Sequence, residues 1–482
     1  MKKRLAGIVW LAALAFVISG CGDYGRERLA VAVSKAPGEV RQRDKTDETD
    51  LFEREEEQTQ RERPVIRDLD EAYEAILGSC SKEFIGGHPV DEAFLSWIHA
   101  VYGEETVIRL AQETERDAPD TGIWYELTGS TVHVLWLTYC KESGLKQCDL
   151  DNVYWKDCAS DTQVVLNFTG DINFDENWCT MKHLDAQPNG VYDCFSEELL
   201  EEMQSADIMM LNNEFTYSDR GEPLEGKDYT FRARPERVKL LEAFGTDIVG
   251  LANNHVWDYG EEALLDTMET LRGEGIPYVG AGRNIDEAKE IIYFIANGRK
   301  IAITAATQIE RSLNYTKEAT EDTAGVLKTL DPEKYIEVLK KAKKNSDIVI
   351  AFVHWGTEGV SGYGADQENL AKAFAEAGAD VIIGGHTHCL QGMTYISGVP
   401  VIYSLGNFWF TQSTIDTGMS QVVIREDGSI DFRFLPCIQK NLKTQLVTDQ
   451  GEKERIFRYM EGISKQISIN EDGYVSDLSK GQ

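Results

Sequence analysis

The sequence is poor in positive charge and lacks the short motifs of several enzyme classes. Its 482 residues contain 49 Lys and Arg against 82 Asp and Glu, which gives a formal net charge of −33. Such an excess of negative charge repels a phosphodiester backbone and argues against a nucleic-acid partner. No Gly-x-Ser-x-Gly, His-Glu-x-x-His or Cys-x-x-Cys motif occurs. Serine hydrolases of that type, zincin proteases, thiol redox proteins and structural zinc sites are therefore not indicated.

Long apolar runs are also absent, with one exception near the N-terminus. Basic residues at positions 2–4 precede the apolar run 5–18, which is shorter than the roughly 20 residues of a membrane-spanning helix. This pattern is typical of a secretory signal peptide, although a short retained anchor also fits it. The run ends in Ile18-Ser19-Gly20-Cys21, which resembles the lipobox of bacterial lipoproteins. That resemblance implies that Cys21 is lipidated and that the protein is extracytoplasmic and anchored to the bacterial cell membrane.

The cysteines agree with that location. Nine are present, and the eight other than Cys21 are an even number, which permits disulfides in an oxidising compartment. Spacing alone does not select a pairing. Whether any of the six upstream cysteines, at positions 80, 140, 148, 158, 179 and 194, are bonded to one another is therefore open.

Composition divides the chain into five segments. Residues 1–20 are the predicted lipoprotein signal peptide, and residues 21–65 are acidic with few apolar side chains, which predicts a disordered tether. Apolar residues at helical spacing over 66–160 predict a small, mostly helical accessory region. Residues 161–440 are predicted as the main α/β domain, and residues 441–482 as a C-terminal helix and tail.

Within the main domain, short β-branched runs alternate with amphipathic stretches. The predicted strands are Val164–Phe168, Asp207–Leu211, Asp247–Leu251, Lys300–Ala305, Asp347–Val353, Asp380–Ile383 and Val401–Ser404. The predicted helices are Glu262–Arg272, Pro332–Lys344 and Gln367–Ala377, with a C-terminal one over Glu452–Ile467. This alternation predicts an α/β fold with a parallel or mixed sheet, closed by an antiparallel hairpin near residues 422–434.

Polar residues follow five of the predicted strands. Ligands of α/β sheets collect at the carboxyl ends of strands. The residues at these positions are Asp171, Glu214, Asn254 with His255 and Asp258, His354, and His386 with His388. Carboxylate, amide and imidazole donors suit Mn, Fe or Zn and need no thiolate. Each element alone also fits a turn, a cap or a packed side chain, but the five together predict a shared divalent-metal site.

The motifs around these residues closely resemble the CapA family, the poly-gamma-glutamate capsule biosynthesis group of the metallophosphoesterase-like superfamily. The resemblance covers about Val164 to Leu435. Its motifs are Ala252-Asn253-Asn254-His255-Val256-Trp257-Asp258-Tyr259-Gly260, Gly280-Ala281-Gly282-Arg283-Asn284, His354-Trp355-Gly356-x-Glu358, Gly385-His386-Thr387-His388 and Tyr403-Ser404-Leu405-Gly406-Asn407-Phe408.

The resemblance implies a four-layer α/β/β/α metallophosphoesterase-like sandwich with one or two metal ions at the sheet edge. It implies the metal ligands Asp171, Glu214, Asn254, His354, His386 and His388. His255 then protonates a leaving group, and we expect Asp258 to orient its ring. Two positions depart from the superfamily, because Asn173 stands where a ligating histidine is usual and Glu214 replaces a bridging aspartate. Whether the centre holds one ion or two is therefore open.

We interpret the chain as a CapA-like protein of capsule synthesis or export. In the first hypothesis it is a metal-dependent hydrolase, in which a metal-bound hydroxide attacks a phosphoryl or acyl centre. In the second it is a non-catalytic, membrane-tethered subunit of a capsule polymer assembly or export complex, with polymer synthase subunits as partners. Arg232 and Arg234 are candidates to bind an anionic polymer or phosphate-containing substrate, and pairing with local acids such as Glu236 accounts for them equally well. His88, His99, His133 and His183 are expected outside the metal site.

Overall fold

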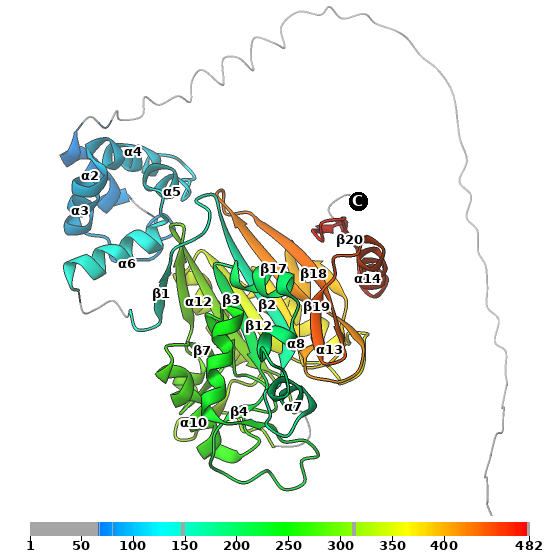
Figure 1. Ribbon diagram of the computed structural model, residues 1–482. Coiled ribbons are helices and arrows are strands. Elements are labelled where there is room, and N and C mark those ends of the chain that lie inside the picture. The colour runs from blue at the N-terminus through cyan, green and yellow to red at the C-terminus, as the bar shows by residue number, and fades with distance from the viewer. Residues whose placement is uncertain (1–65, 67, 80, 146–149, 311–314, 480–482) are drawn as a thin grey trace, which may run out of the picture. The chain divides into compact units, whose positions relative to one another are not determined.

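A computed structural model of the protein describes residues 66, 68–79, 81–145, 150–310 and 315–479. Figure 1 labels its elements. The predicted signal peptide, the tether and Cys21 lie outside the described residues. Within the described part of the chain, no helix combines the length and the apolar character that crossing a membrane requires.

The first of two large sheets has seven strands. In spatial order they are β1 (Val153–Lys156), β9 (Ile292–Ala296), β10 (Arg299–Thr307), β12 (Ile348–His354), β13 (Val381–Gly385), β15 (Val399–Ile402) and β14 (Met393–Ile396). The strands from β10 to β15 are parallel, so their carboxyl ends meet at one edge. Side chains alternate between the two faces of a strand. Accordingly, Ile301 and Ile303 of β10 belong to a different core cluster from Ala302 and Ala306.

The second sheet has eight strands. They are β19 (Lys443–Leu446), β18 (Ile430–Lys440), β17 (Ile415–Arg425), β2 (Gln163–Ile172), β3 (Ile208–Asn213), β6 (Ile248–Gly250) and β7 (Tyr278–Val279), with β16 (Asn407–Trp409) also paired to β2. The run from β2 to β7 is parallel. The predicted closing hairpin is present as β17 and β18. It is longer than predicted, because both strands continue away from the turn at Asp427-Gly428, β17 from as early as Ile415 and β18 as far as Lys440.

Three hydrophobic clusters place the sheets and helices in four layers (Figure 1). One cluster fills the space between the two sheets. A second lies between the eight-stranded sheet and the helices α7 (Cys179–Asp185), α8 (Val191–Cys194), α9 (Glu197–Gln204), η1 (Pro235–Phe244) and α10 (Gly260–Gly273). The third lies between the seven-stranded sheet and the helices α11 (Ile285–Ala288), α12 (Glu333–Asn345) and α13 (Ala365–Glu376). The predicted α/β/β/α sandwich is confirmed.

The segment before the sandwich has its own core. Its helices are α2 (Leu69–Ser79), α3 (Glu92–Tyr102), α4 (Glu104–Thr114), α5 (Ile123–Thr128) and α6 (Val132–Ser143), and Phe94, Trp124 and Leu135 are among the side chains they bury together. The run Val132–Leu137, which fits helix or strand by sequence, lies in α6. This helix is buried along most of its length, and a helix buried on several sides shows no clear 3.6-residue period.

The accessory segment continues past its last helix and contributes a strand to the sandwich. Residues 153–156, predicted within the helical region, form β1, which pairs in parallel with β9 at the edge of the seven-stranded sheet. The seam is also hydrogen-bonded, because Thr131 Oγ1 donates to Asp347 Oδ2 at 2.8 Å. His88 and His133 lie on this side of the molecule, with Nε2 of one 2.9 Å from Nδ1 of the other. They are therefore neighbours in space, which their separation in sequence did not indicate.

Small elements complete the chain. The paired short strands are β4 (Thr216–Tyr217) with β5 (Arg232–Ala233), β8 (Ala281–Gly282) with β11 (Gly325–Val326), and β20 (Ile467–Ile469) with β21 (Val475–Asp477). The C-terminal helix α14 (Gln450–Ile463) begins with Asp449, whose side chain accepts from the Glu452 amide. This cap places the helix slightly earlier than the predicted Glu452–Ile467. Among the predicted candidates, Cys140 is disulfide-bonded, whereas Cys158, Cys179 and Cys194 are free thiols.

Candidate metal centre

The carboxyl ends of strands from both sheets bring the predicted ligands together. Asp171 lies near the end of β2, level with Asn212 of β3. His354 ends β12 and is level with Gly385 of β13, which His386 follows directly. Parallel strands end at a common edge, and the two sheets face each other across the central core, so both sets of side chains converge.

Glu214 is the side chain that most clearly lacks a partner. It is fully buried, and among the described residues no hydrogen bond reaches either of its carboxylate oxygens. The nearest ring nitrogen is Nε2 of His354, 3.3 Å from Oε1. Burial, together with the negative charge of Asp171, raises the pKa of Glu214 well above its ordinary value. A buried carboxylate without hydrogen bonds is costly, and a bound cation would remove that cost.

The pKa of Asp171 is shifted in the opposite direction from that of Glu214. Its Oδ1 accepts from Asn212 Nδ2 at 2.7 Å, and its Oδ2 lies 3.3 Å from Nδ1 of His388. Burial alone would raise the pKa of Asp171, but the histidines His388 and His354 outweigh burial, and the pKa lies below its ordinary value. Asp171 is thus ionised and ready to ligate.

His354 is the centre of the imidazole group. Its Nε2 lies 2.8 Å from Oδ1 of Asn254 and 3.2 Å from Nδ1 of His386. Burial lowers the pKa of His354 to about 3, although Asp171 opposes the shift. His354 is therefore neutral over the physiological range, as a metal-ligating imidazole must be.

Two overlapping sets of ligands can be formed from these side chains. Glu214, His354 and His386 offer three atoms within 4.8 Å of one another, and so do Asp171, Glu214 and His388. Glu214 belongs to both sets. Glu214 would therefore be available to a divalent cation held by either set. Oxygen and imidazole donors with an unpaired buried carboxylate fit a divalent cation.

The backbone at the Gly-His-x-His motif is unusual. His386 and His388 have φ of 93° and 57°, conformations that residues other than glycine adopt uncommonly and at some energetic cost. A Cβ at Gly385 would lie 3.0 Å from Oδ1 of Asp171. The two sheets therefore approach so closely here that a larger residue would press on a ligand. The two imidazoles belong to the two different sets of potential ligands, and their ring centroids lie 6.1 Å apart.

His255 and Asp258 form a dyad beside the ligands. Nδ1 of His255 lies 2.6 Å from Oδ2 of Asp258, and the two residues are brought together by a turn. Asp258 also lies 2.7 Å from Nζ of Lys227, a buried cation that contacts the carbonyl of Asn254 as well. Burial lowers the pKa of His255, and Asp258 opposes the shift. Asp258 therefore holds the ring with Nδ1 toward the carboxylate.

The two candidate arginines are engaged outside the ligand cluster. Arg232 lies over the ring of Tyr259, 4.1 Å from its centroid, and donates to the carbonyls of residues 220 and 221. Arg234 pairs with Glu176 at 3.1 Å, not with the predicted Glu236. Within the described part of the chain, neither guanidinium contacts a candidate metal ligand. Their assignment to substrate binding stays a prediction.

Asn173, the residue noted above in place of a ligating histidine, makes a hydrogen bond within its own loop. Its Oδ1 accepts from the Asp175 amide at 2.7 Å, an Asx turn that forms the loop after β2. His183, predicted in a polar loop, instead lies in α7, where its Nδ1 contacts Gln187. Local structure accounts for His183 and for Oδ1 of Asn173, whereas the buried Nδ2 of Asn173 has no hydrogen-bond partner among the described residues.

Three residues of the site were missed by sequence reasoning. Asn212 bonds Asp171 and lies 3.4 Å from Nδ1 of His354, while Oδ1 of Asn407 lies 2.7 Å from Nδ1 of His388. Lys227 supports the dyad. Asn407 lies within the noted motif Tyr403–Phe408, and Asn212 lies near the end of β3, two residues before Glu214, so their positions were a usable signal. Lys227 lies in a loop, and nothing local distinguishes it from other lysines.

The layered sheets and the ligand cluster at their shared edge define an α/β protein with a candidate divalent-metal centre. A model of the bacterial capsule synthesis protein family PGA_cap matches residues 165–412, which is more than half of the chain. The chain belongs to this family. The match includes all six predicted metal ligands and the dyad.

Named relatives agree with this assignment. The chain is 34% identical to the capsule biosynthesis protein CapA of Bacillus anthracis over 242 residues, which cover 48% of this chain and 58% of that protein. It is 34% identical to the PGA biosynthesis protein CapA of Bacillus subtilis over 252 residues, which cover 51% and 65%. The chain thus spans less than two thirds of the length of these relatives.

A solved structure of a 5'-nucleotidase from Candida albicans is also similar. It is 12% identical, covers 58% of this chain and 53% of that chain, and has a TM-score of 0.31. A similarity at this level supports no conclusion about the activity of this chain.

Proposed function

We propose that this protein is a metal-dependent hydrolase of capsule polymer synthesis or export, with a divalent cation bound between the two sheets. The observation that carries the proposal is the carboxylate of Glu214, which is buried, without hydrogen bonds among the described residues, and common to two sets of potential ligands. A carboxylate in that state would help to hold a divalent cation, which would satisfy its oxygens.

The roles of the side chains follow from their geometry. Asp171, Glu214, Asn254, His354, His386 and His388 would hold Mn, Fe or Zn. A bound divalent cation lowers the pKa of water and polarises a phosphoryl or acyl oxygen. His255, which ligates nothing in this arrangement, exchanges a proton with the departing group, and Asp258 and Lys227 keep its ring in place. A ring held in this way can act as a general acid or base without reorienting.

The family supports a proposal for the substrate class. The Bacillus subtilis relative is named for PGA biosynthesis, and we infer that this chain acts on an anionic capsule polymer of the poly-gamma-glutamate type or on a phosphate-containing precursor. We further propose that it works beside the polymer synthase subunits at the membrane.

The first test measures metal and hydrolysis together. The full chain, purified in detergent, should contain at least one molar equivalent of divalent metal by mass spectrometry. It should hydrolyse either bis-p-nitrophenyl phosphate or a poly-gamma-glutamate oligomer, and chelation should abolish the reaction until Mn, Fe or Zn is returned. A metal-replete protein inactive on both substrates would favour the alternative of a non-catalytic assembly subunit.

We propose separately that Cys21 carries the lipid anchor. A diacylglyceryl group supplies two acyl chains, which hold a protein at a membrane far more firmly than one. Cys21→Ala should leave the precursor unprocessed or release the protein from the membrane fraction, as followed by immunoblotting. Cys179→Ala, which removes a free thiol elsewhere, should fractionate like the wild type. Identical processing of the Cys21 variant and the wild type would refute the anchor.

A further inference from the structure

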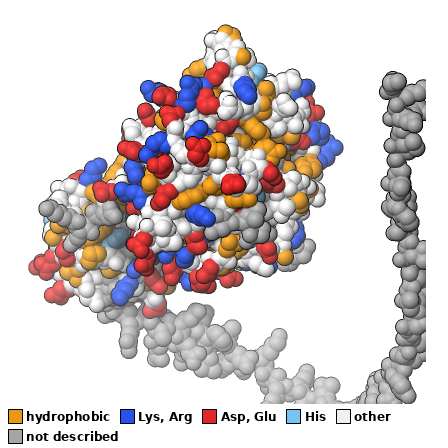
Figure 2. Space-filling view, turned by 90° about the horizontal axis from the view of Figure 1, so that it is seen from below, with side chains coloured by type: hydrophobic (Ala, Val, Ile, Leu, Met, Phe, Trp, Pro, Cys, Tyr) orange, Lys and Arg blue, Asp and Glu red, His pale blue; other side chains and the backbone are white. Residues whose placement is uncertain are grey.

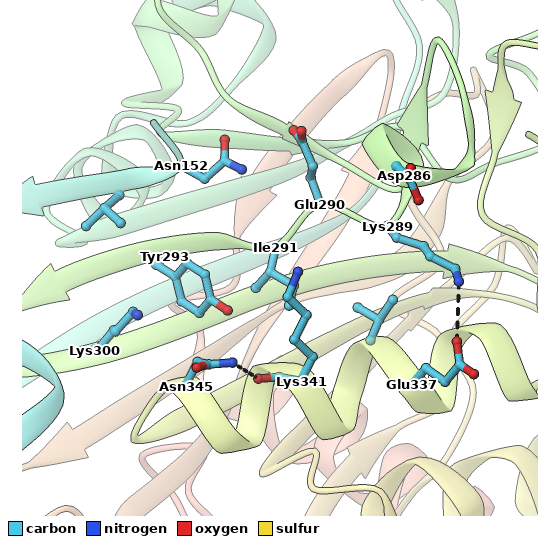
Figure 3. Close-up of a pocket in the computed structure, with 12 residues that line it drawn as sticks. Asn152, Asp286, Lys289, Glu290, Ile291, Tyr293, Lys300, Glu337, Lys341 and Asn345 are labelled. Atoms are coloured by element: carbon cyan, nitrogen blue, oxygen red, sulfur yellow. Dashed lines mark hydrogen bonds and ion pairs between the residues drawn. The ribbon is translucent and has the colours of Figure 1, made fainter. Parts of the chain in front are cut away.

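A cavity of about 600 Å³ lies at the opposite end of the seven-stranded sheet from the metal centre. It is enclosed by the start of β1, by β9 and by the outer helix α12 (Figure 3). Lys300 stands at the amino end of β10, whose other end, Thr307, is level with His354. Seven residues of extended strand span about 23 Å. The cavity is therefore separate from the candidate metal centre.

Lys300 is the unusual group in this cavity. Only 6% of the residue is exposed, and its ammonium nitrogen lies 4.0 Å from the centroid of the Tyr293 ring. Among the described residues, no side-chain or backbone oxygen accepts a hydrogen bond from this ammonium group. Desolvation lowers the pKa of Lys300 to about 8, although Asp347 opposes the shift. The ammonium group lines the cavity, so an anionic occupant could supply the acceptor that the described protein groups do not.

The other charged groups lie nearer the solvent. Lys341 extends from α12 toward Ile291 across the cavity, and Lys289 pairs with Glu337 at its side (Figure 3). Asp286 and Glu290 are exposed at the rim. Water and salt screen exposed charges much more than buried ones. In the depth of the cavity the positive charge is therefore mainly that of Lys300, supported by Lys341 and partly offset by the half-buried Asp347.

The remaining lining favours an organic molecule over a bare inorganic anion. The ring of Tyr293 and the side chains of Ile291 and Val338 face the same space, and a volume of several hundred Å³ is typical of small-molecule sites. The acidic rim would repel a doubly charged phosphate more strongly than a singly charged carboxylate. Figure 2 shows basic and acidic side chains interspersed over one face of the molecule. Such a mixed surface does not select one kind of ligand, so selectivity for a carboxylate would come from the groups that line the cavity.

We propose that this cavity binds a small organic monocarboxylate, with the carboxylate against Lys300 and Lys341 and the apolar body against Tyr293 and Ile291. The carboxylate supplies the acceptor that Lys300 lacks. The site joins β1 of the accessory segment to the sandwich, so an occupant contacts both parts of the fold.

Isothermal titration of the full chain with benzoate tests the site. Benzoate should bind saturably, whereas benzamide, which has the same shape but no charge, and inorganic phosphate should bind at least tenfold more weakly. Lys300→Met should weaken benzoate binding by about tenfold or more, because a hydrogen bond to a charged group is lost. Lys341→Gln should weaken it by a smaller factor. Lys340→Gln, which makes the same charge change one residue away on the exposed face of α12, should leave it unchanged.

A second measurement keeps the proposal testable if Lys300→Met does not fold. Amine labelling of Lys300 in the wild type, read by mass spectrometry, should slow when benzoate is present, while labelling of Lys340 should not change. Equal binding of benzoate and phosphate would overturn the carboxylate assignment. Benzoate binding that is absent, or that is unaffected by both Lys300→Met and Lys341→Gln, would overturn the site.

Discussion

Replacing His354 by alanine is expected to remove tightly bound divalent metal from the purified protein. Nε2 of His354 lies no more than 3.3 Å from a side-chain atom of each of three other candidate ligands, Glu214, Asn254 and His386. The variant therefore loses the imidazole around which these three side chains gather. Mutating residues that only support a ligand typically weakens metal affinity about 10–100-fold, and loss of a direct ligand should exceed that range. Metal content after dialysis, measured by mass spectrometry, gives the result.

A matched control is provided by His183. It lies in α7 and contacts Gln187, so His183→Ala removes an imidazole without touching the candidate centre. This variant should keep full metal content. His388→Ala, whose side chain belongs to the other ligand set, should lower the content too. Unchanged metal stoichiometry in both the His354 and the His388 variants would show that these histidines are packed side chains and not ligands.

Replacing His255 by alanine is expected to lower the rate of hydrolysis by about 10²–10⁴-fold while metal content and folding are retained. His255 contacts Asp258 through Nδ1 and ligates nothing in this arrangement, so its loss should affect proton transfer and not the cation. The measurements are kcat on the substrate that the wild type hydrolyses, metal content, and the unfolding midpoint.

The support of the His255 ring can be tested in the same assay. Lys227 holds Asp258 at 2.7 Å, and Lys227→Met keeps the length of the side chain but removes its charge. We expect a smaller loss in kcat than for His255→Ala and little further loss when the two substitutions are combined, since both act through one group. Additive losses would place Lys227 in a separate role.

The same variant separates catalysis from assembly in cells. If hydrolysis is the function, cells carrying the metal-replete His255→Ala protein should fail to make normal capsule polymer, as the His354→Ala control does. Normal polymer in the His255 variant, together with lost hydrolysis in vitro, would assign the protein to the assembly complex.

Local sequence predicted the central strands and several helices of the sandwich, together with the candidate site residues at the strand ends. β10 and β12 were predicted because β-branched and small apolar residues run unbroken there, and both faces of these strands are buried. The ligands Asp171, His354 and His386 were predicted because strands and their following residues are local features, and ligands collect at strand ends. The Asn254–His255 pair and Asp258 were likewise placed together by spacing along one turn.

What the sequence by itself determined was which residues stand at strand ends, since the alternation of buried side chains along a strand is a property of neighbouring residues. Only the tertiary structure decided that Asn212 bonds Asp171, that Lys227 supports Asp258, and that β1 pairs with β9. These contacts join segments far apart in the chain and depend on how the sheets and loops pack. The tertiary structure also decided that Glu214 and Lys300 are buried. Burial is produced by the whole fold and not by the residues on either side.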